Sequence, residues 1–229
     1  MNRQLYLECY SGISGDMTVA ALLDLGADEQ ILRKALASLP VGGFEIAVTR
    51  KVKSGLDVCD FDVILDAEHE NHDHDMEYLH GHDHHHDHGH HHEHCHEHVH
   101  EDGSVHTHGH HHEHRGLHEI LHIIEHADMT ERAKETAVRI FQILAEAESK
   151  AHGVPADQVH FHEVGAVDSI VDILAVAVCL DNLDITEVIV PFLCEGQGSI
   201  RCQHGIIPVP VPAVVNIAQA HGLTLKPTG

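Results

Sequence analysis

Residues 164–183, VGAVDSIVDILAVAVCLDNL, predict a helix that is apolar on nearly every side. Asp168 and Asp172 lie inside its first half and, being four residues apart, share one face of the helix. A carboxylate among apolar side chains needs partners, and a functional site is one source of partners. The alternative is that both carboxylates lie on a narrow solvent-exposed side of the helix.

Strands and helices alternate along the rest of the chain and predict an α/β or α+β fold. A turn near Ser54 joins two of the strands into a predicted hairpin, and the Gly and Pro residues of 196–212 predict loops. Predicted strands are 5–9, 44–48, 58–65, 159–161 and 186–190, and the other predicted helices are 17–25, 28–39, 117–124, the segment between Thr130 and Gly153, and 213–220.

The chain has 229 residues, with 13 Lys and Arg against 37 Asp and Glu, and a formal net charge of −24. This charge argues against binding to nucleic acid or to an anionic membrane surface, since both need basic residues. No apolar run reaches the roughly 18–20 residues of a membrane span. The N-terminus lacks a signal-peptide pattern, so we expect a cytoplasmic protein. The 6 Cys form no C-x-x-C pair, which favours free thiols over disulfides or a zinc finger.

Histidine dominates one segment, because 22 of the 30 His residues lie between His69 and His114, together with 11 acids and no Lys or Arg. We interpret 67–115 as a disordered insert with too few apolar residues to fold, placed between two parts of an α/β domain at 1–66 and 116–229. Many imidazoles on a flexible tether suit an exchangeable store of late divalent metals. The alternative is a low-complexity expansion without function. The candidate storage histidines are His84, His85, His86, His90, His91, His92, His110, His111 and His112.

The sequence HFHEVGAVDSIVD, which begins at His160, carries the sharpest candidate site. His160 and His162 alternate on an extended chain and therefore point to the same side. Together with Glu163, Asp168 and Asp172 they form a donor set that suits a divalent transition metal with open positions. The alternative is that His162 and Glu163 only cap the following helix.

Two loops add further candidates. The turn-rich loop SGISGD lies between the first predicted strand and helix, where backbone N–H groups beside glycines favour a phosphate, with a plain helix cap as the alternative. Its candidate residues are Ser11, Gly12, Ser14, Gly15 and Asp16. The chain has no G-x-x-x-x-G-K-[ST] pattern, which excludes a P-loop GTPase. The second loop contains Cys202 and His204, and we take His204 as a further metal candidate.

Three segments together resemble one protein family: SGISGDM from Ser11, HFHEVGAVDSIVD from His160, and His204-Gly205 followed by Pro208-Val209-Pro210. They are similar to the nickel insertion protein family of nickel-pincer cofactor biosynthesis (LarC), and a His-rich insert at this place also fits. The resemblance implies insertion of Ni(II) into pyridinium-3,5-bisthiocarboxylic acid mononucleotide by a cyclometallase of the lyase class. It also implies a downstream nickel-pincer enzyme such as lactate racemase.

The resemblance also implies CTP with Mn or Mg in a C-terminal domain that follows the part matched here. We therefore expect this chain to be a fragment or to work with a C-terminal partner polypeptide. Two other functions remain open on the residues alone. One is a non-catalytic nickel storage and delivery chaperone, and the other is an unrelated metal-dependent hydrolase.

Overall fold

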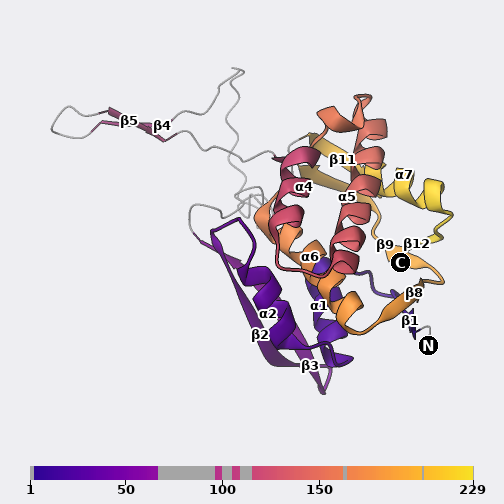
Figure 1. Cartoon of the computed structure of the whole chain (residues 1–229). Coiled ribbons are helices and arrows are strands. Elements are labelled where there is room, and N and C mark those ends of the chain that lie inside the picture. The colour runs from indigo at the N-terminus through magenta and orange to yellow at the C-terminus, as the bar shows by residue number, and fades with distance from the viewer. Residues whose placement is uncertain are drawn as a thin grey trace. The chain divides into compact units, whose positions relative to one another are not determined.

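The structure is a computed structural model, and it describes residues 3–66, 96–99, 105–108, 115–161, 164–202 and 204–228 (Figure 1). The chain divides into two units, Met1–Asn71 with His114–Gly229, and His72–Glu113. In the second unit the described elements are β4 (His96–Val99) and β5 (Val105–His108), which pair antiparallel. Apart from Arg115, which belongs to the first unit, the rest of the predicted insert lies outside the described residues, and so do all nine candidate storage histidines.

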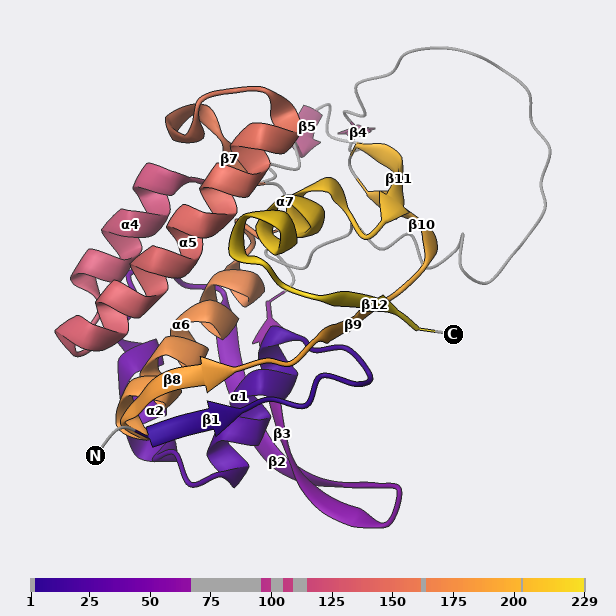
Figure 2. The same ribbon diagram turned by 90° about the vertical axis from the view of Figure 1, so that its right-hand side faces the viewer.

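The predicted apolar helix is α6 (Val167–Asn182), and the first unit packs around it. Helices α1 (Gly15–Asp24), α2 (Glu29–Ala37) and α5 (Glu131–His152) all contact α6. Its Ile170, Val171 and Leu174 are fully buried, as its apolar sequence predicts. The helix begins three residues later than predicted because residues 164–166 form a turn. Helices α4 (Leu117–His126) and α7 (Pro212–His221) pack on α5 (Figure 2).

Helix ends follow the signals read in the sequence. The Asp28 carboxylate accepts hydrogen bonds from the backbone N–H groups of Gln30 and Ile31 at the start of α2. The Thr130 hydroxyl accepts from the N–H of Ala133 at the start of α5, and Gly153 ends α5 with a φ of 69°. Such caps satisfy backbone groups that have no partner within the helix.

The strands form pairs rather than one large sheet. The predicted hairpin is β2 (Phe44–Lys53) with β3 (Leu56–Leu65), antiparallel in a register that joins Phe44 to Leu65. This hairpin packs against α1 and α6 through β3. The mixed α/β class predicted from the sequence is confirmed.

Parallel pairs connect the two ends of the first unit. β1 (Arg3–Tyr6) runs parallel to β8 (Ile185–Ile189), and β9 (Leu193–Glu195) runs parallel to β12 (Leu225–Pro227), as Figure 2 shows. The N–H of Cys194 donates to the carbonyl of Cys9 at 3.1 Å and continues the first pair. The first strand, predicted at 5–9, begins and ends earlier as β1, and the expectation from its apolar residues that it would be buried is wrong, because it lies at the surface with Tyr6 55% exposed.

Two short antiparallel pairs shape the region of the candidate ligands. β6 (Arg115–Gly116) pairs with β7 (His160–Phe161) just after the 3-10 turn η1 (Ala156–Gln158). β10 (Gly198–Cys202) pairs with β11 (Gly205–Val209), although loops were predicted there. None of the helices in the described part of the chain has the length and apolar character that a membrane crossing requires.

Candidate functional site: an imidazole–thiol pocket and a carboxylate cluster

His160 and His204, two metal candidates from distant parts of the sequence, line one pocket of about 290 Å³. The pocket lies between the end of α5, β7, the β10–β11 hairpin and the start of α7. Cys202 and His152 line it as well, and we call this place the imidazole–thiol pocket. The remaining lining residues are Glu148, Ala151, Phe161, Val164, Ile207, Val211, Pro212 and Ala213.

Strand β7 orients His160 toward this pocket. Gly116 pairs with His160 and Arg115 pairs with Phe161 across the β6–β7 ladder. Phe161 is 2% exposed and packs edge-to-face on Phe141, whereas His160 is exposed. Both residues line the pocket, and the shared side of His160 and His162 stays a prediction. The other two candidates of this segment, at positions 162 and 163, lie outside the described residues.

The turn between β10 and β11 brings a thiol and an imidazole together. The Cys202 Sγ lies 3.7 Å from the His204 Nδ1. The His204 ring also lies against the ring of His152, with 4.9 Å between their centroids. Gly205 follows with a φ of 87°, a conformation that glycine adopts without strain.

His152 and Glu148 on α5 were not among the residues predicted from the sequence. His152 Nε2 lies 3.5 Å from the Glu148 Oε2, as residues four apart on a helix can. A Glu and a His at this spacing directly before the helix-ending Gly153 were the available signal. A carboxylate beside a ring nitrogen orients an imidazole that binds metal through its other nitrogen.

The predicted carboxylates of Asp168 and Asp172 lie outside the imidazole–thiol pocket, because neither residue is among those that line it. Asp172 lies against the start of α1, where a Cβ added to Gly15 would come within 2.4 Å of its Oδ2. The N–H of Asp16 donates to the Asp172 carboxylate. Only a glycine at position 15 allows the two helices to approach this closely, and we call Asp16, Asp168 and Asp172 the carboxylate cluster.

The electrostatics of the carboxylate cluster are unfavourable for ionised Asp172. The pKa of Asp172 is raised from 3.8 to about 7, chiefly by burial and also by the charges of Asp16, Asp168 and Asp62, while a hydrogen bond from the N–H of Asp16 lowers it. The Asp172 Oδ1 is buried and has no hydrogen-bond partner among the residues that the structure describes. A carboxylate that titrates near neutral pH can accept or release a proton under physiological conditions.

The SGISGD loop, the phosphate candidate, leads directly into this cluster. Ser14 is the N-cap of α1, but its side chain makes no cap hydrogen bond and its hydroxyl donates to Asp16 instead. Gly12 has a φ of 87° and its N–H donates to the Cys9 carbonyl at 3.3 Å, while Ser11 is exposed. Negative charge next to the loop opposes an anion, so a phosphate there needs a protonated Asp172 or a bridging cation.

Within the part of the chain that the structure describes, no three His, Cys, Asp or Glu side chains are grouped closely enough to hold a metal ion. The donors that line the imidazole–thiol pocket, His152, His160, Cys202 and His204, do not form such a group.

Comparison with known proteins gives a consistent family. The family model described as nickel insertion protein matches residues 5–229. A protein of Alkaliphilus metalliredigens named pyridinium-3,5-bisthiocarboxylic acid mononucleotide nickel insertion protein is 51% identical over the whole chain, which covers 48% of that relative. Proteins with the same name from Clostridium acetobutylicum and Geobacillus kaustophilus are 45% and 40% identical over 94% of the chain, which covers 49% and 44% of them.

The chain spans about half the length of the curated relatives it matches. No solved structure matches it. The match of the family model over nearly the whole sequence establishes that the chain belongs to the nickel insertion protein family.

Proposed function

We propose that this chain binds nickel in the imidazole–thiol pocket and delivers it for insertion into pyridinium-3,5-bisthiocarboxylic acid mononucleotide, the substrate in the relatives' names. The observation that carries the proposal is that His160 and His204, 44 residues apart in sequence, line one pocket with Cys202 and His152. Imidazole and thiolate are the donors that late first-row metals such as nickel prefer.

The pocket suits transfer rather than storage. Its apolar walls, among them Phe161 and Ile207, limit access of water, and its volume of about 290 Å³ accommodates a metal ion with part of a small substrate. Few protein ligands leave coordination positions for the incoming sulfur and carbon atoms of the substrate. His162 and Glu163 belong to the proposed ligand set through their sequence positions beside His160.

The carboxylate cluster supplies the second part of the proposed site. Formation of a nickel–carbon bond releases a ring proton, which needs an acceptor. Asp172, with a pKa of about 7, is the described carboxylate whose pKa best suits that task at neutral pH, and because it lies outside the pocket the proton has to reach it through the substrate or water. The SGISGD loop offers backbone N–H groups for the substrate phosphate once the charge of the cluster is balanced.

The remaining features of the proposal come from the resemblance and concern the longer protein. They are CTP with Mn or Mg in the C-terminal half, a downstream nickel-pincer enzyme, classification as a lyase, a cytoplasmic location, and a nickel-storing role for the histidine-rich insert at 67–115 between 1–66 and 116–229. The storage role adds capacity for nickel, and the pocket performs the delivery.

The test combines His160→Ala with His204→Ala and measures activation of lactate racemase in a reconstituted mixture. The mixture contains the chain, a polypeptide covering the C-terminal half of the relatives, CTP, Mn²⁺, nickel and the mononucleotide. We expect activation to fall at least about 100-fold, since positioned ligands typically contribute on this scale, while total nickel bound by the chain hardly changes. The control is His221→Ala, an exposed His in the last turn of α7 that does not line the pocket. Full activation by the double variant would contradict the proposal.

A further inference from the structure

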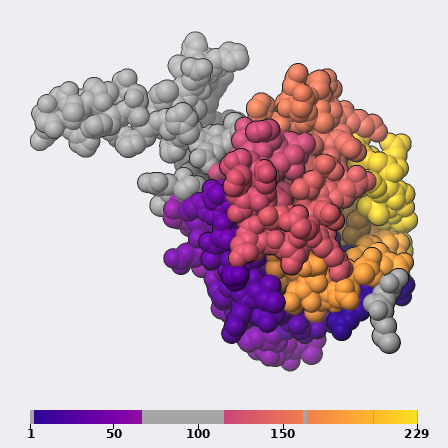
Figure 3. Space-filling model, viewed as in Figure 1, coloured from indigo at the N-terminus to yellow at the C-terminus, as the bar shows by residue number. Residues whose placement is uncertain are grey.

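Helix α4 carries a row of histidines on its exposed side. His118, His122 and His126 recur every four residues, and Glu119 and Glu125 lie on the same exposed side. The opposite side of α4 is buried through Ile120, Ile123 and Ile124. Figure 3 shows that α4 and α5 form a broad part of one face of the molecule. None of these histidines lines the imidazole–thiol pocket.

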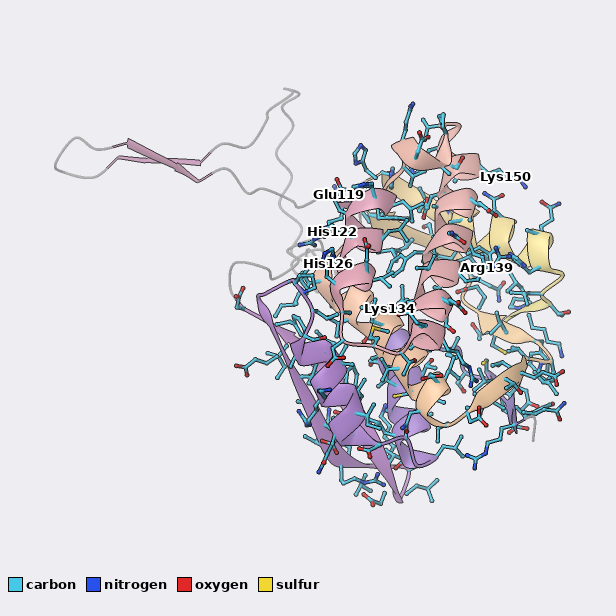
Figure 4. The ribbon with its side chains drawn as sticks, viewed as in Figure 1. Glu119, His122, His126, Lys134, Arg139 and Lys150 are labelled. Carbon is cyan, nitrogen blue, oxygen red and sulfur yellow. The ribbon has the colours of Figure 1, made fainter. Side chains whose placement is uncertain are left out.

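Two of these rings already lie together. The His122 and His126 rings have 4.2 Å between their centroids and an angle of 31° between their planes. Figure 4 shows both residues along the outer side of α4. Metal–nitrogen bonds of about 2.1 Å place two adjacent ligand nitrogens about 3 Å apart, which these rings reach by rotation about their side-chain bonds.

A hydrogen bond fixes which nitrogen of His126 is available. The His126 Nδ1 lies 2.9 Å from the backbone carbonyl oxygen of His122. A carbonyl oxygen only accepts, so Nδ1 carries the hydrogen, and the lone pair of the neutral ring lies on Nε2. Metal-binding histidines are commonly oriented in this way, with one ring N–H donating to a backbone carbonyl and the other nitrogen facing the metal.

We propose that His122 and His126 form a second metal site, a two-imidazole site on the surface of α4 for one late divalent first-row ion, with Ni²⁺ as the ion tested. Two histidines four residues apart on one helix face are an effective chelating pair, and imidazole favours the later metals of this row. Water completes the coordination. The site does not depend on the proposed function of the imidazole–thiol pocket.

The position along α4 selects this pair over His118 with His122, which has the same spacing. His126 lies in the last turn of α4, and the C-terminal end of a helix favours a cation. His118 lies in the first turn, where the helix dipole disfavours a cation. The Glu119 carboxylate is folded against Gly116, where an added Cβ would lie 2.9 Å from its Oε2, so it faces the helix start rather than His122.

Positive charge lies near this helix end on Lys134 and on Lys34, whose Nζ pairs with the Asp128 Oδ2 at 2.9 Å just beyond the helix. Lys134 Nζ donates to the Glu125 backbone carbonyl at 2.8 Å. Figure 4 shows Lys134 on the side of α4 that faces α5, whereas His122 and His126 are on the outer side. The Glu125 side chain, on the exposed side, adds negative charge that offsets a bound cation.

The test measures hydrogen exchange of backbone amides in the whole chain with and without Ni²⁺ held at a fixed free concentration by a metal buffer. A metal that bridges one helical turn lowers the equilibrium constant for local opening of that turn. The factor is one plus the ratio of the free metal concentration to Kd. At free Ni²⁺ about ten times Kd, we expect exchange in the last turn of α4 to slow about tenfold. The exchange of α5 amides is the internal reference for stabilisation elsewhere in the fold.

Variants separate this site from the others. His122→Gln and His126→Gln should each abolish the nickel effect, whereas His118→Gln, on the same helix and at the same spacing from His122, should retain it. Gln is a good helix former, and all three positions are exposed, so unchanged α5 exchange without metal verifies folding.

No slowing in the wild-type chain, or slowing that survives His126→Gln, would overturn the proposal. If His118→Gln and His126→Gln lost the nickel effect to the same extent, the choice of His122 and His126 as the pair would be overturned. The His160→Ala and His204→Ala double variant should keep the α4 effect, which distinguishes failure of this site from failure of the pocket.

Discussion

Asp172→Asn should stabilise the fold, and should do so more at alkaline than at acidic pH. The pKa of Asp172 is raised from 3.8 to about 7 in the fold, first by burial and then by neighbouring carboxylates. The unfolded chain therefore ionises this group at lower pH than the folded chain does, so folding stability falls as the pH rises from about 4 to about 7. An amide of the same shape removes this penalty and can still accept from the N–H of Asp16.

The size of the effect follows from the pKa interval and the burial of the side chain. At about 1.4 kcal/mol per pH unit, an interval of roughly three units corresponds to about 4 kcal/mol. Asp172 is only partly buried, and screening by water reduces the effect to about 2 kcal/mol at pH 8. For a chain of this length that is a gain of about 4–8 °C in Tm. At pH 5 the gain should be about a third as large, because most of the penalty has not developed.

The assay is thermal unfolding of the wild-type chain and the variant at pH 5, 6, 7 and 8, with a chelator to remove divalent cations. Protonation of the many other histidines affects both chains alike and cancels in the difference. Asp184→Asn is the control, since Arg132 lowers the pKa of Asp184 and its neutralisation should give no gain at either pH. A gain that is the same at pH 5 and pH 8, or a loss at pH 8, would refute the electrostatic reasoning.

Deleting residues 69–114 should reduce nickel binding from many weak equivalents to a few, with unchanged circular dichroism of the remainder; unchanged stoichiometry by equilibrium dialysis would contradict a storage role. Lowering the pH from 7.5 to 5.5 should release most nickel from the whole chain, since each imidazole must lose a proton to bind metal, and full retention would count against imidazole ligands. Gly15→Ala should cost about 1–3 kcal/mol in the free energy of unfolding, because its Cβ would lie 2.7 Å from the Asp172 Cβ and force α1 away from α6. The control is Gly42→Ala, since a Cβ at Gly42 would meet no atom within 4 Å and Gly42, like Gly15, has no positive φ, and an equal cost in both variants would contradict the steric reasoning.

Local signals in the sequence predicted the elements that local chemistry determines. Helix α2 begins after Asp28, α5 lies between Thr130 and Gly153, and the β2–β3 hairpin forms, all as predicted. The β10–β11 hairpin was missed because Gly and Pro suggest breaks in regular structure. Pro208 nevertheless pairs with Ser199 within that hairpin, since a two-stranded ribbon has outer edges where a missing N–H is tolerated.

The candidate site was predictable in its residue types but not in their grouping. The sequence pattern placed His160 and Asp172 in one motif, and the structure places His160 in the pocket while Asp172 packs against α1. His160 and Asp172 are close in sequence but lie apart because one belongs to β7 and the other to α6, with a turn between these elements. His204 lines the same pocket as His160 because of the β10–β11 hairpin. The pairing of these two strands cannot be predicted from the local periodicity of the sequence. Predicting that Glu148 and His152 line the pocket would have required the position of the end of α5 in the fold.

The separation of the two groups follows the chemistry of their donors. Imidazole and thiol groups of His152, His160, Cys202 and His204 surround a partly apolar pocket, where soft donors favour a late transition metal over magnesium or manganese. The carboxylate cluster lies beside the backbone N–H groups of the SGISGD loop, and the described residues there are not grouped closely enough to hold a metal ion. The proposed nickel delivery therefore takes its preference for a late transition metal from the nitrogen and sulfur donors of the pocket, and the role left to the carboxylates is that of proton acceptor.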